Sequence, residues 1–355
     1  MRVLFAAHDP GGANVIYSLI ASAVSEQIEP TVWAAGPARH ILPMAEPWEM
    51  PGDEHQVTKL LIAAKPDIVV TGTSMHSTFE QRCWLAAKTL GIPSIAVIDA
   101  WAHYQERFNY SQGVSVFPTN IFVIDQPCKE GIEAICPGET QVHIIGHPFL
   151  EQRMAEYKLT EKDCHPKRTF GDMQTIIFFS EPLQGDFGRE NPYSEDQYDI
   201  ANRLVVAAGK LRHQVLIKPH PREHIEDWLK WLELQKPGVG YVSITNDDAK
   251  RLLQKGGIVV GMATMVLVEA VLSGLKAISV QPGITYVPNP LIDRLTTVLT
   301  DSDHDALQTT LEAALELDET SQKAMNVDPR LFEGTCQRAW AIIMSCSPIA
   351  GQISV

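Results

Sequence analysis

The sequence predicts an α/β fold with two Rossmann-like domains of GT-B type, each built on a parallel sheet. Two observations carry this prediction. Short apolar runs suited to buried strands alternate with helical patterns over residues 2–145, and the same alternation begins again at Thr175. Such alternation is typical of parallel strands joined by right-handed helical crossovers. At 355 residues, the chain is long enough for two domains of ordinary size.

The first run opens with a buried strand over residues 2–7, a turn that contains Gly11 and Gly12, and a helix over 15–25. Strand, glycine turn and helix in this order open a doubly wound domain. The glycines either let a ligand or a neighbouring loop approach the backbone, or they only close the turn. The elements expected after this opening are strands at 29–34, 68–71, 94–98, 120–124 and 142–145, and helices at 56–64, 79–90 and 127–135.

The second run follows a charged stretch, which predicts a linker at residues 151–172 between a first domain at 1–150 and a second at 173–330. A final helix within residues 331–355 is expected to cross back to the first domain. The elements expected in the second domain are strands at 175–179, 215–218, 240–244, 258–261 and 276–280, and helices at 197–211, around Trp228 and Trp231, at 247–253, 264–272 and 304–317.

Composition limits the classes of function. The 29 Lys and Arg residues against 43 Asp and Glu give a net charge of −14, which argues against a general nucleic-acid binder and against an electrostatic membrane anchor. No apolar run is long enough for a transmembrane segment, and the run at residues 3–7 is too short for a signal peptide. The six cysteines show no CxxC spacing, so we expect reduced thiols in a cytoplasmic protein.

Two strand ends in the second domain suit a phosphate-bearing ligand. Residues 215–223 run from a buried strand into a turn with Lys218 and His220, and residues 261–270 run from a strand into a small-residue loop and a helix. Phosphate groups bind at such helix starts and at the carboxyl ends of parallel strands. The residues expected to bind the donor are Ser180, Lys218, His220, Gly261, Ala263, Thr264 and Glu269.

With these segments the chain resembles the GT-B superfamily, which comprises two-domain nucleotide-sugar glycosyltransferases and the related UDP-N-acetylglucosamine 2-epimerases. Residues 142–148 are similar to the Gly-Asn-Pro type segment that precedes the linker, and residues 248–283 to the donor-side βαβ unit. The Lys-Pro-His-Pro segment at 218–221 with Thr264 resembles capsule-type, sialyltransferase-like and polyol-phosphate transferases. Where those families often have a Ser-Ser or Ser-Thr pair, this chain has Ala263-Thr264. The nucleotide of the donor could therefore be UDP or CMP.

The resemblance implies transfer of a sugar, which leaves a nucleotide phosphate behind. Positive charge from His220 and Lys218, N–H groups of the following helix and the hydroxyl of Thr264 can meet the charge of that phosphate. Glu269 is similar to glutamates that accept hydrogen bonds from a ribose diol. The alternatives are that Lys218 is solvated or ion-paired and that His220 only caps a turn. Since we identify no carboxylate pair anywhere in the sequence for a divalent metal on the diphosphate, we expect metal-independent chemistry without a cofactor.

An inverting transfer also needs a base for the acceptor hydroxyl, which we expect from the first domain. Asp9 is the first candidate, followed by His103 and Asp99, and His220 completes the catalytic set; Asp9 could equally be a turn residue. Residues 99–108 are expected to face a cleft between the domains, opposite His220. The residues predicted on the acceptor side are Gly11, Gly12, Trp101, Tyr104 and Arg107, with the two aromatic rings stacking on a sugar.

Competing hypotheses remain for this segment and for the whole chain. Trp101 and Phe108 could be ordinary core residues, and Arg107 could pair with Glu106 or a neighbour at the surface. The chain could be an epimerase or hydrolase of sugar nucleotides, or a binding subunit without catalysis. The partners expected for a transferase in polysaccharide biosynthesis are a nucleotide-sugar donor and a glycan or small-molecule acceptor, with no nucleic acid; a homo-oligomer is compatible with the sequence.

Overall fold

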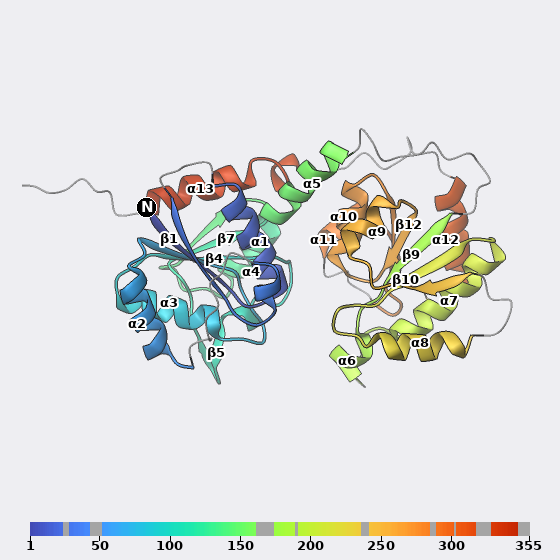
Figure 1. Ribbon diagram of the computed structural model, residues 1–355, viewed down its shortest axis with the longest axis horizontal. Coiled ribbons are helices and arrows are strands. Elements are labelled where there is room, and N and C mark those ends of the chain that lie inside the picture. Colours follow the sequence, from blue (N-terminus) through green and yellow to red (C-terminus); the bar gives the residue numbers. More distant parts are fainter. Residues whose placement is uncertain are drawn as a thin grey trace, which may run out of the picture. The chain divides into compact units, whose positions relative to one another are not determined.

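The structure is a computed structural model that describes residues 1–23, 28–42, 52–160, 174–188, 191–235, 241–284, 289–301, 303–316 and 328–346. The chain divides into two compact units (Figure 1). The first unit comprises Met1–Arg153 and Asp328–Val355, and the second comprises Met154–Val327. Most of the predicted linker, residues 161–172, lies outside the described residues, as does Cys164.

The first unit contains a six-stranded parallel sheet in the order β2-β1-β3-β4-β7-β8. The chain starts in the interior of the sheet, moves outward to β2 and then returns to the other side of β1 with β3. The strand order therefore reverses between β1 and β3, and ligands bind at such reversals in α/β proteins. The strands are β1 (Arg2–Ala7), β2 (Glu29–Ala34), β3 (Ile68–Thr71), β4 (Ser94–Val97), β7 (Asn120–Val123) and β8 (Gln141–Ile144).

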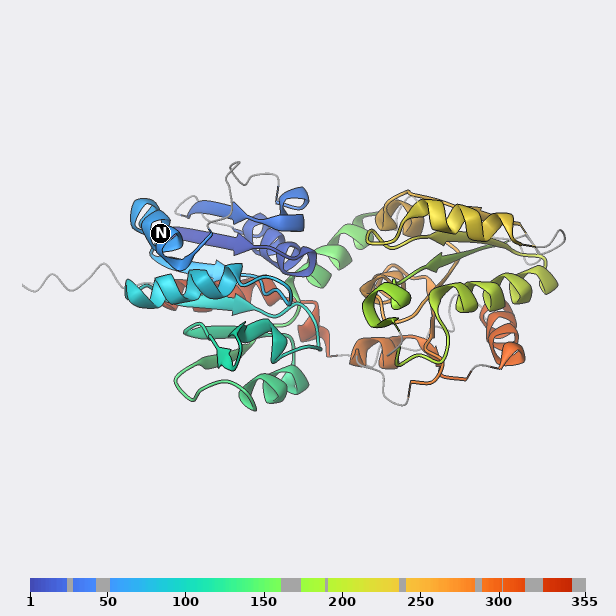
Figure 2. The same ribbon diagram turned by 90° about the horizontal axis from the view of Figure 1, so that it is seen from below.

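Helices cover both faces of the first sheet (Figures 1 and 2). Because alternate residues of a strand face opposite sides, Phe5 packs with Ile16 of α1 and Ile343 of α13, whereas Leu4 packs with residues of α2 and α3. The red C-terminal helix α13 thus belongs to the same core as the blue N-terminal strand. The helices of this unit are α1 (Pro10–Ala21), α2 (Glu54–Ala64), α3 (Phe79–Thr89), α4 (Gln126–Glu133), α5 (Pro148–Thr160) and α13 (Thr335–Cys346), with short 3₁₀ segments η1 (Gly36–His40), η2 (Glu106–Phe108) and η5 (Pro329–Leu331).

The second unit has a parallel sheet in the order β11-β10-β9-β12-β13-β14, which reverses between β9 and β12. Helices α7, α8 and α12 pack on one face, and α9, α10 and α11 lie on the other (Figure 1). The strands are β9 (Thr175–Phe179), β10 (Gln214–Lys218), β11 (Val242–Ile244), β12 (Ile258–Gly261), β13 (Lys276–Val280) and β14 (Thr297–Leu299). The helices are α6 (Leu183–Phe187), α7 (Gln197–Lys210), α8 (Ile225–Glu233), α9 (Ala249–Gln254), α10 (Met265–Leu272), α11 (Pro290–Leu295) and α12 (His304–Glu316).

The sequence patterns missed some short elements, among them β14, α11 and the antiparallel hairpin of β5 (Asn109–Ser111) and β6 (Val114–Ser115). The hairpin residues are mostly exposed, so they carry no alternation of apolar and polar side chains that a strand prediction could use. Over the described residues, no helix combines the length and apolar character that a membrane crossing requires.

Candidate functional site

The loops that follow β1 and β3 meet at the carboxyl edge of the first sheet, where the strand order reverses. A Cβ atom on Gly12 would lie 3.0 Å from the backbone N of Thr73, and one on Gly72 would lie 2.6 Å from the Cα of Gly12. Any larger side chain would push these loops apart. Gly12 therefore serves the close approach of a neighbouring loop, which is one of the uses predicted for it.

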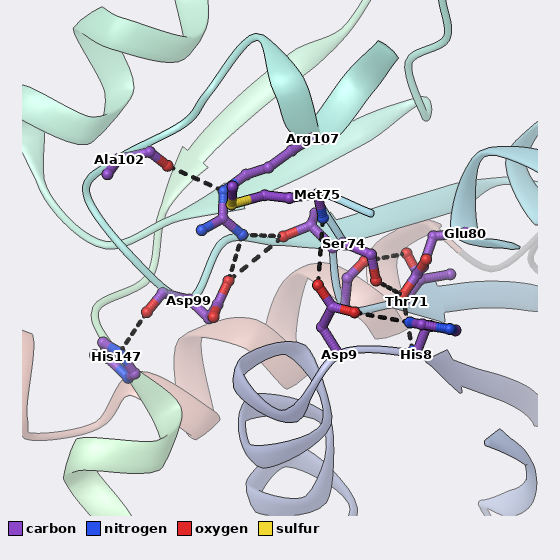
Figure 3. Close-up of polar contacts among 12 residues, drawn as sticks. His8, Asp9, Thr71, Ser74, Met75, Glu80, Asp99, Ala102, Arg107 and His147 are labelled. Atoms are coloured by element: carbon purple, nitrogen blue, oxygen red, sulfur yellow. Dashed lines mark hydrogen bonds and ion pairs between the residues drawn. The ribbon is translucent and has the colours of Figure 1, made fainter. Parts of the chain in front are cut away.

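Asp99, which follows β4, is held by a buried arginine (Figure 3). Nη1 of Arg107 lies 2.5 Å from Oδ1 of Asp99 and donates to the hydroxyl of Thr73 at 2.6 Å. Only 6% of the Arg107 side chain and 16% of the Asp99 side chain are exposed. The other oxygen of Asp99 lies against α1, since a Cβ on Gly11 would come within 1.8 Å of it. Arg107 is thus committed to Asp99 and not to Glu106 at the surface.

His8 and Asp9, which follow β1, form a second pair. Nδ1 of His8 lies 2.7 Å from Oδ1 of Asp9, and the backbone N–H of Met75 donates to Oδ2 of Asp9 at 3.3 Å. Because a carboxylate only accepts, this contact assigns the imidazole proton to Nδ1 and leaves Nε2 as the basic atom. Both side chains are partly exposed, at 20% and 28%. A histidine oriented by an aspartate in this way removes protons from hydroxyl groups in many enzymes.

Glu80, the second residue of α3, is a fully buried carboxyl group. Its Oε1 accepts hydrogen bonds from the backbone N–H of His8 at 2.9 Å and from the hydroxyl of Ser74 at 2.8 Å. Oε2 has no partner among the described residues. Burial raises the pKa of Glu80 to about 7, and the nearby carboxylate of Asp9 contributes in the same direction. Glu80 therefore ties the loop after β1 to the loop after β3.

The predicted acceptor segment, residues 99–108, is more buried than expected. Trp101 is 7% exposed, and its indole N–H donates to the N-cap carboxylate of α4 at 2.9 Å. The ring is therefore not available for stacking on a sugar, which corrects that prediction. Tyr104 packs on α4, where a Cβ on Gly131 would lie 2.4 Å from its ring. His103 is exposed and has a φ of 58°, in the left-handed region that non-glycine residues rarely adopt.

His147, which follows β8, supports Asp99 from the backbone side (Figure 3). Its Nε2 lies 3.1 Å from the carbonyl oxygen of Asp99, and its side chain is buried. Burial lowers the pKa of His147 to about 4, so the imidazole is neutral at physiological pH. Because Nε2 donates to a carbonyl, Nδ1 is unprotonated, and it has no partner among the described residues.

In the second unit, His220 follows β10 and offers an N–H group. The backbone N–H of Arg222 donates to Nδ1 of His220 at 3.1 Å, so the proton of the neutral ring is on Nε2. Burial lowers the pKa of His220 to about 4, and the cations of Arg222 and Lys218 act in the same direction. This corrects the prediction of positive charge at His220: the side chain is a neutral hydrogen-bond donor at physiological pH.

Two other predicted donor residues already have partners inside the unit. The hydroxyl of Ser180 donates to Oε1 of Glu223 at 3.0 Å, and Oε2 of Glu223 accepts the backbone N–H of His220 at 2.7 Å. Nζ of Lys218 donates to Oδ1 of Asn246 at 3.0 Å, and partial burial lowers the pKa of this lysine. Glu223 thus shapes the turn that carries His220, and the Lys218 ammonium lies beside the end of β11.

The N-terminus of α10, predicted to bind phosphate, holds a carboxyl group of the chain itself. Oε1 of Glu181 accepts the N–H of Ala263 at 2.7 Å, and the N–H groups of Met262 and Thr264 also bond to this side chain. Burial raises the pKa of Glu181 to about 7. Thr264 is the N-cap of α10, because its hydroxyl oxygen accepts the N–H of Val266 at 3.3 Å.

The remaining donor-side candidates line the same strand end. A Cβ on Gly261 would lie 3.0 Å from the methyl group of Thr264 and 3.3 Å from the carbonyl oxygen of Phe179, so the loop is tightly packed. Glu269 lies on α10 and is 6% exposed. Its contact with a ribose stays a prediction.

Within the described part of the chain, no group of three or more His, Cys, Asp and Glu side chains is placed to hold a metal ion. The prediction of metal-independent chemistry took no account of two overlapping Asp-x-Asp triplets, residues 301–303 and 303–305, which follow β14. The carbonyl oxygens of Asp301 and Asp303 accept hydrogen bonds from Nη2 of Arg203 at 3.2 and 2.9 Å. These bonds fix the turn that leads into α12.

Sequence reasoning missed His8, Glu80, Glu181 and Glu223 as members of these networks. His8 and Glu181 each adjoin a residue that was predicted, and Glu223 lies within the predicted turn after β10. Counting every polar residue within a few positions of a strand end would have found these three. Glu80 gives no such signal, because a glutamate in the first turn of a helix is usually exposed and favoured there by the helix dipole.

No protein-family model and no curated protein matches the chain. Several solved structures do match the chain. The UDP-GlcNAc 2-epimerase of Neisseria meningitidis, bound to UDP-GlcNAc, aligns over 97% of this chain and 100% of its own with 14% identity and a TM-score of 0.68. The UDP-GlcNAc 2-epimerase of Methanocaldococcus jannaschii, in complex with UDP-GlcNAc and UDP, aligns over 97% and 100% with 12% identity and a TM-score of 0.65.

MurG of Acinetobacter baumannii aligns over 97% of this chain and 99% of its own, with 12% identity and a TM-score of 0.56. At identities this low, a likeness that extends over nearly the whole of each chain shows a shared fold. The chain therefore has the two-domain Rossmann-like fold of GT-B type that the sequence predicts.

Proposed function

We propose that this chain is an enzyme that moves a sugar from a nucleotide-activated donor to a hydroxyl acceptor. The likeness in fold to UDP-GlcNAc 2-epimerases and to MurG supports chemistry on nucleotide sugars in general. The observation that favours transfer is the His8–Asp9 pair, 2.7 Å between Nδ1 and Oδ1, at the carboxyl edge of the first sheet. An imidazole held in this way suits the removal of a proton from a hydroxyl group.

The nucleotide is assigned to the second unit. The Nε2–H of His220 and the hydroxyl of Thr264 lie at the ends of β10 and β12, on either side of β9. As the bond to the sugar breaks, charge grows on the nucleotide phosphate, and fixed N–H and O–H donors stabilise it without reorganising. We propose a UDP or CMP nucleotide, an acceptor that is a glycan or a small molecule, and no cofactor.

An epimerase or hydrolase of sugar nucleotides is the second candidate. It is favoured by the TM-score of 0.68 with the Neisseria epimerase against 0.56 with MurG. It is also supported by Asp99, a carboxylate whose position is set by Arg107. Such an enzyme would consume a sugar nucleotide in the absence of any acceptor, whereas a transferase would need the acceptor.

Turnover and binding assays test this proposal. UDP and CMP sugars are incubated with and without a panel of hydroxyl acceptors, and products are measured by mass spectrometry. We expect turnover only with an acceptor, and we expect its loss in His8→Ala and Asp9→Asn. His103→Ala is the comparison, because the exposed His103 was the next candidate for the base. Turnover without acceptor would favour epimerisation or hydrolysis, and loss in His103→Ala alone would move the base to that residue.

Nucleotide binding is measured separately by calorimetry. His220→Ala and Thr264→Ala each remove a hydrogen bond to a charged phosphate, which typically contributes about 1.5–3 kcal/mol, or about tenfold to a hundredfold in Kd. The fold should stay intact, because His220 lies in a loop at the sheet edge and Thr264→Ala removes a single N-cap bond of α10, which typically costs about 1 kcal/mol. Unchanged affinity in both variants would mean that the nucleotide binds elsewhere.

A further inference from the structure

Glu80 is a buried titratable group that the proposed mechanism does not use. A glutamate at this depth normally has a cationic partner or hydrogen bonds on both oxygens. Among the described residues, Glu80 has no ion pair, and one of its oxygens has no partner at all. The other oxygen receives both hydrogen bonds, one from the backbone of His8 and one from the side chain of Ser74.

These bonds close a ring of contacts around the His8–Asp9 pair (Figure 3). Glu80 connects the amide of His8 to Ser74, and the next residue, Met75, donates its own N–H to Asp9 at 3.3 Å. The carboxylate of Asp9 in turn contacts the imidazole of His8 at 2.7 Å, and this contact completes the ring of contacts. The backbone of His8 and the carboxylate of Asp9 are therefore both fixed through the loop that Glu80 anchors.

On the basis of the proposed function, we propose that Glu80 is a positioning residue for the His8–Asp9 pair: its carboxyl fixes the loop that carries the pair, and its charge acts on the imidazole of His8. The residue itself is enclosed and touches no substrate. It acts through the amide of His8 and through its electric field.

The charges around Glu80 give the direction of the effect. Asp9 faces it from the loop after β1, and Cys83 lies one turn further along α3 with a pKa that burial raises, while the charge of Arg82 acts on Cys83. Among the described residues, the charged group that acts on Glu80 is thus the carboxylate of Asp9, which adds no positive charge. When Glu80 ionises, a negative charge appears on the carboxyl group that accepts the backbone N–H of His8, and such a charge stabilises the positive charge that arises nearby as the base accepts a proton.

An NMR titration tests the contact without using activity. An amide proton that donates to a carboxyl group changes its chemical shift when that group ionises. We expect the His8 amide proton of the wild-type protein to show a step with its midpoint near pH 7. In Glu80→Gln the acceptor oxygen stays and the charge is lost, so this step should disappear. Persistence of the step in the variant, or its absence in the wild-type protein, would overturn the proposal.

Glu151→Gln is the matched control. Glu151 is a half-buried carboxylate of the same unit that accepts the N–H groups of Thr335 and Cys336, away from the His8 loop. In Glu151→Gln the His8 amide proton should keep its step. Loss of the step in this variant would show that the chemical shift reports on the unit as a whole. If Glu80→Gln does not fold, the titration of the wild-type protein still decides. The absence of a step between about pH 5 and about pH 9 would contradict the contact.

The kinetic arm measures kcat/KM against pH with the substrates found above. We expect the wild-type profile to rise through pH 7, and Glu80→Gln to lack this rise and to be about tenfold slower at alkaline pH, with unchanged KM for the nucleotide sugar. An identical profile in both proteins would overturn the charge effect. If no sugar nucleotide turns over with wild-type protein, the proposed function fails, and the NMR titration still decides the role of Glu80.

Discussion

The two sheets reverse their strand order in the same way but place different groups at the reversal. In the first unit, Glu80 and Asp9 accept backbone N–H groups of His8 and Met75, and the carboxylate of Asp99 pairs with the guanidinium of Arg107. In the second unit, the carboxyl groups of Glu181 and Glu223 accept backbone N–H groups. The same topology thus carries a His8–Asp9 pair and an Arg107–Asp99 pair at the first edge, and carboxyl groups that accept loop N–H groups at the second.

The comparison is sharpest for two glutamates, Glu80 and Glu181. Burial raises the pKa of each to about 7. Glu80 lies beside the carboxylate of Asp9, which disfavours a second negative charge. Glu181 lies at the N-terminus of α10, where the helix dipole favours an anion. The same residue type, with its pKa raised to about 7 in both units, thus lies beside a carboxylate in one unit and at the N-terminus of a helix in the other.

The largest effect is expected from Arg107→Met. The substitution leaves the carboxylate of Asp99, which is only 16% exposed, without its cationic partner, and loss of one partner of a buried pair typically costs about 3–5 kcal/mol. Chemical denaturation followed by fluorescence and circular dichroism should show the first unit unfolding at lower denaturant, with the second unit unaffected.

Arg222→Met is the control for that experiment. Arg222 pairs with Asp186 in the second unit, with Nη2 to Oδ2 at 2.8 Å, but 59% of its side chain is exposed. Exposed ion pairs contribute about 0–1 kcal/mol. Equal losses in the two variants would contradict the view that the Arg107–Asp99 pair is a buried element of the first edge.

The next effect concerns the stability of the first unit against pH. The folded pKa of Glu80 is raised from 4.5 to about 7, so the unfolded chain releases this proton at lower pH than the folded chain. Stability should therefore fall as pH rises from about 4.5 to about 7 and level off above, by about 3 kcal/mol, since 2.5 pH units correspond to 2.5 times 1.36 kcal/mol.

Glu80→Gln removes the charge and should remove this pH dependence. Relative to wild-type, the free energy that is needed to unfold the variant should increase between about pH 4.5 and about pH 7 and stay constant above. The test is how the difference in stability between variant and wild-type changes with pH. A buried amide N–H of Gln without a partner lowers the stability of the variant by the same amount at every pH. A difference that does not change with pH would mean that Glu80 ionises normally in the folded protein.

A smaller effect, of about 1–2 kcal/mol, is expected from Glu181→Gln on nucleotide binding. Ionised Glu181 competes with a phosphate for the N–H groups at the start of α10, and the amide does not carry that charge. The variant should bind UDP or CMP more tightly than wild-type at pH 8 and about equally at pH 6, as measured by calorimetry. Weaker binding at pH 8 would identify Glu181 as a support for the loop instead of a competitor.

The smallest expected effect is that of pH on the nucleotide affinity lost in a His220 variant. The pKa of His220 is lowered to about 4, so the ring is neutral throughout the range from about pH 6 to about pH 8. The loss of nucleotide affinity in His220→Gln should then be the same at both ends of that range. A loss that shrinks as pH rises would show that His220 binds phosphate as a cation.

The sequence predicts the strands well, because runs such as residues 68–71 and 258–261 are apolar on both sides and end in glycine turns. It predicts the positions of candidate residues for the same reason, since a strand end is visible in the pattern. It does not predict which side chains pair. Arg107 and Asp99 are eight residues apart, and a turn through the left-handed His103 brings them together. The inward direction of Glu80 likewise depends on packing that no local pattern records.

Helix α13 has a consequence for how the protein is made. Its residues Ala339 and Ile343 complete the core around the first strand, and the ring of Trp340 meets that of Phe5 edge to face at 6.2 Å. A ribosome that has translated Met1–Arg153 has therefore not yet supplied the residues that close this core. The second unit, although encoded later, is contiguous in sequence and can finish folding first. The unit that is begun first during synthesis is thus the one whose core needs the last helix of the described chain.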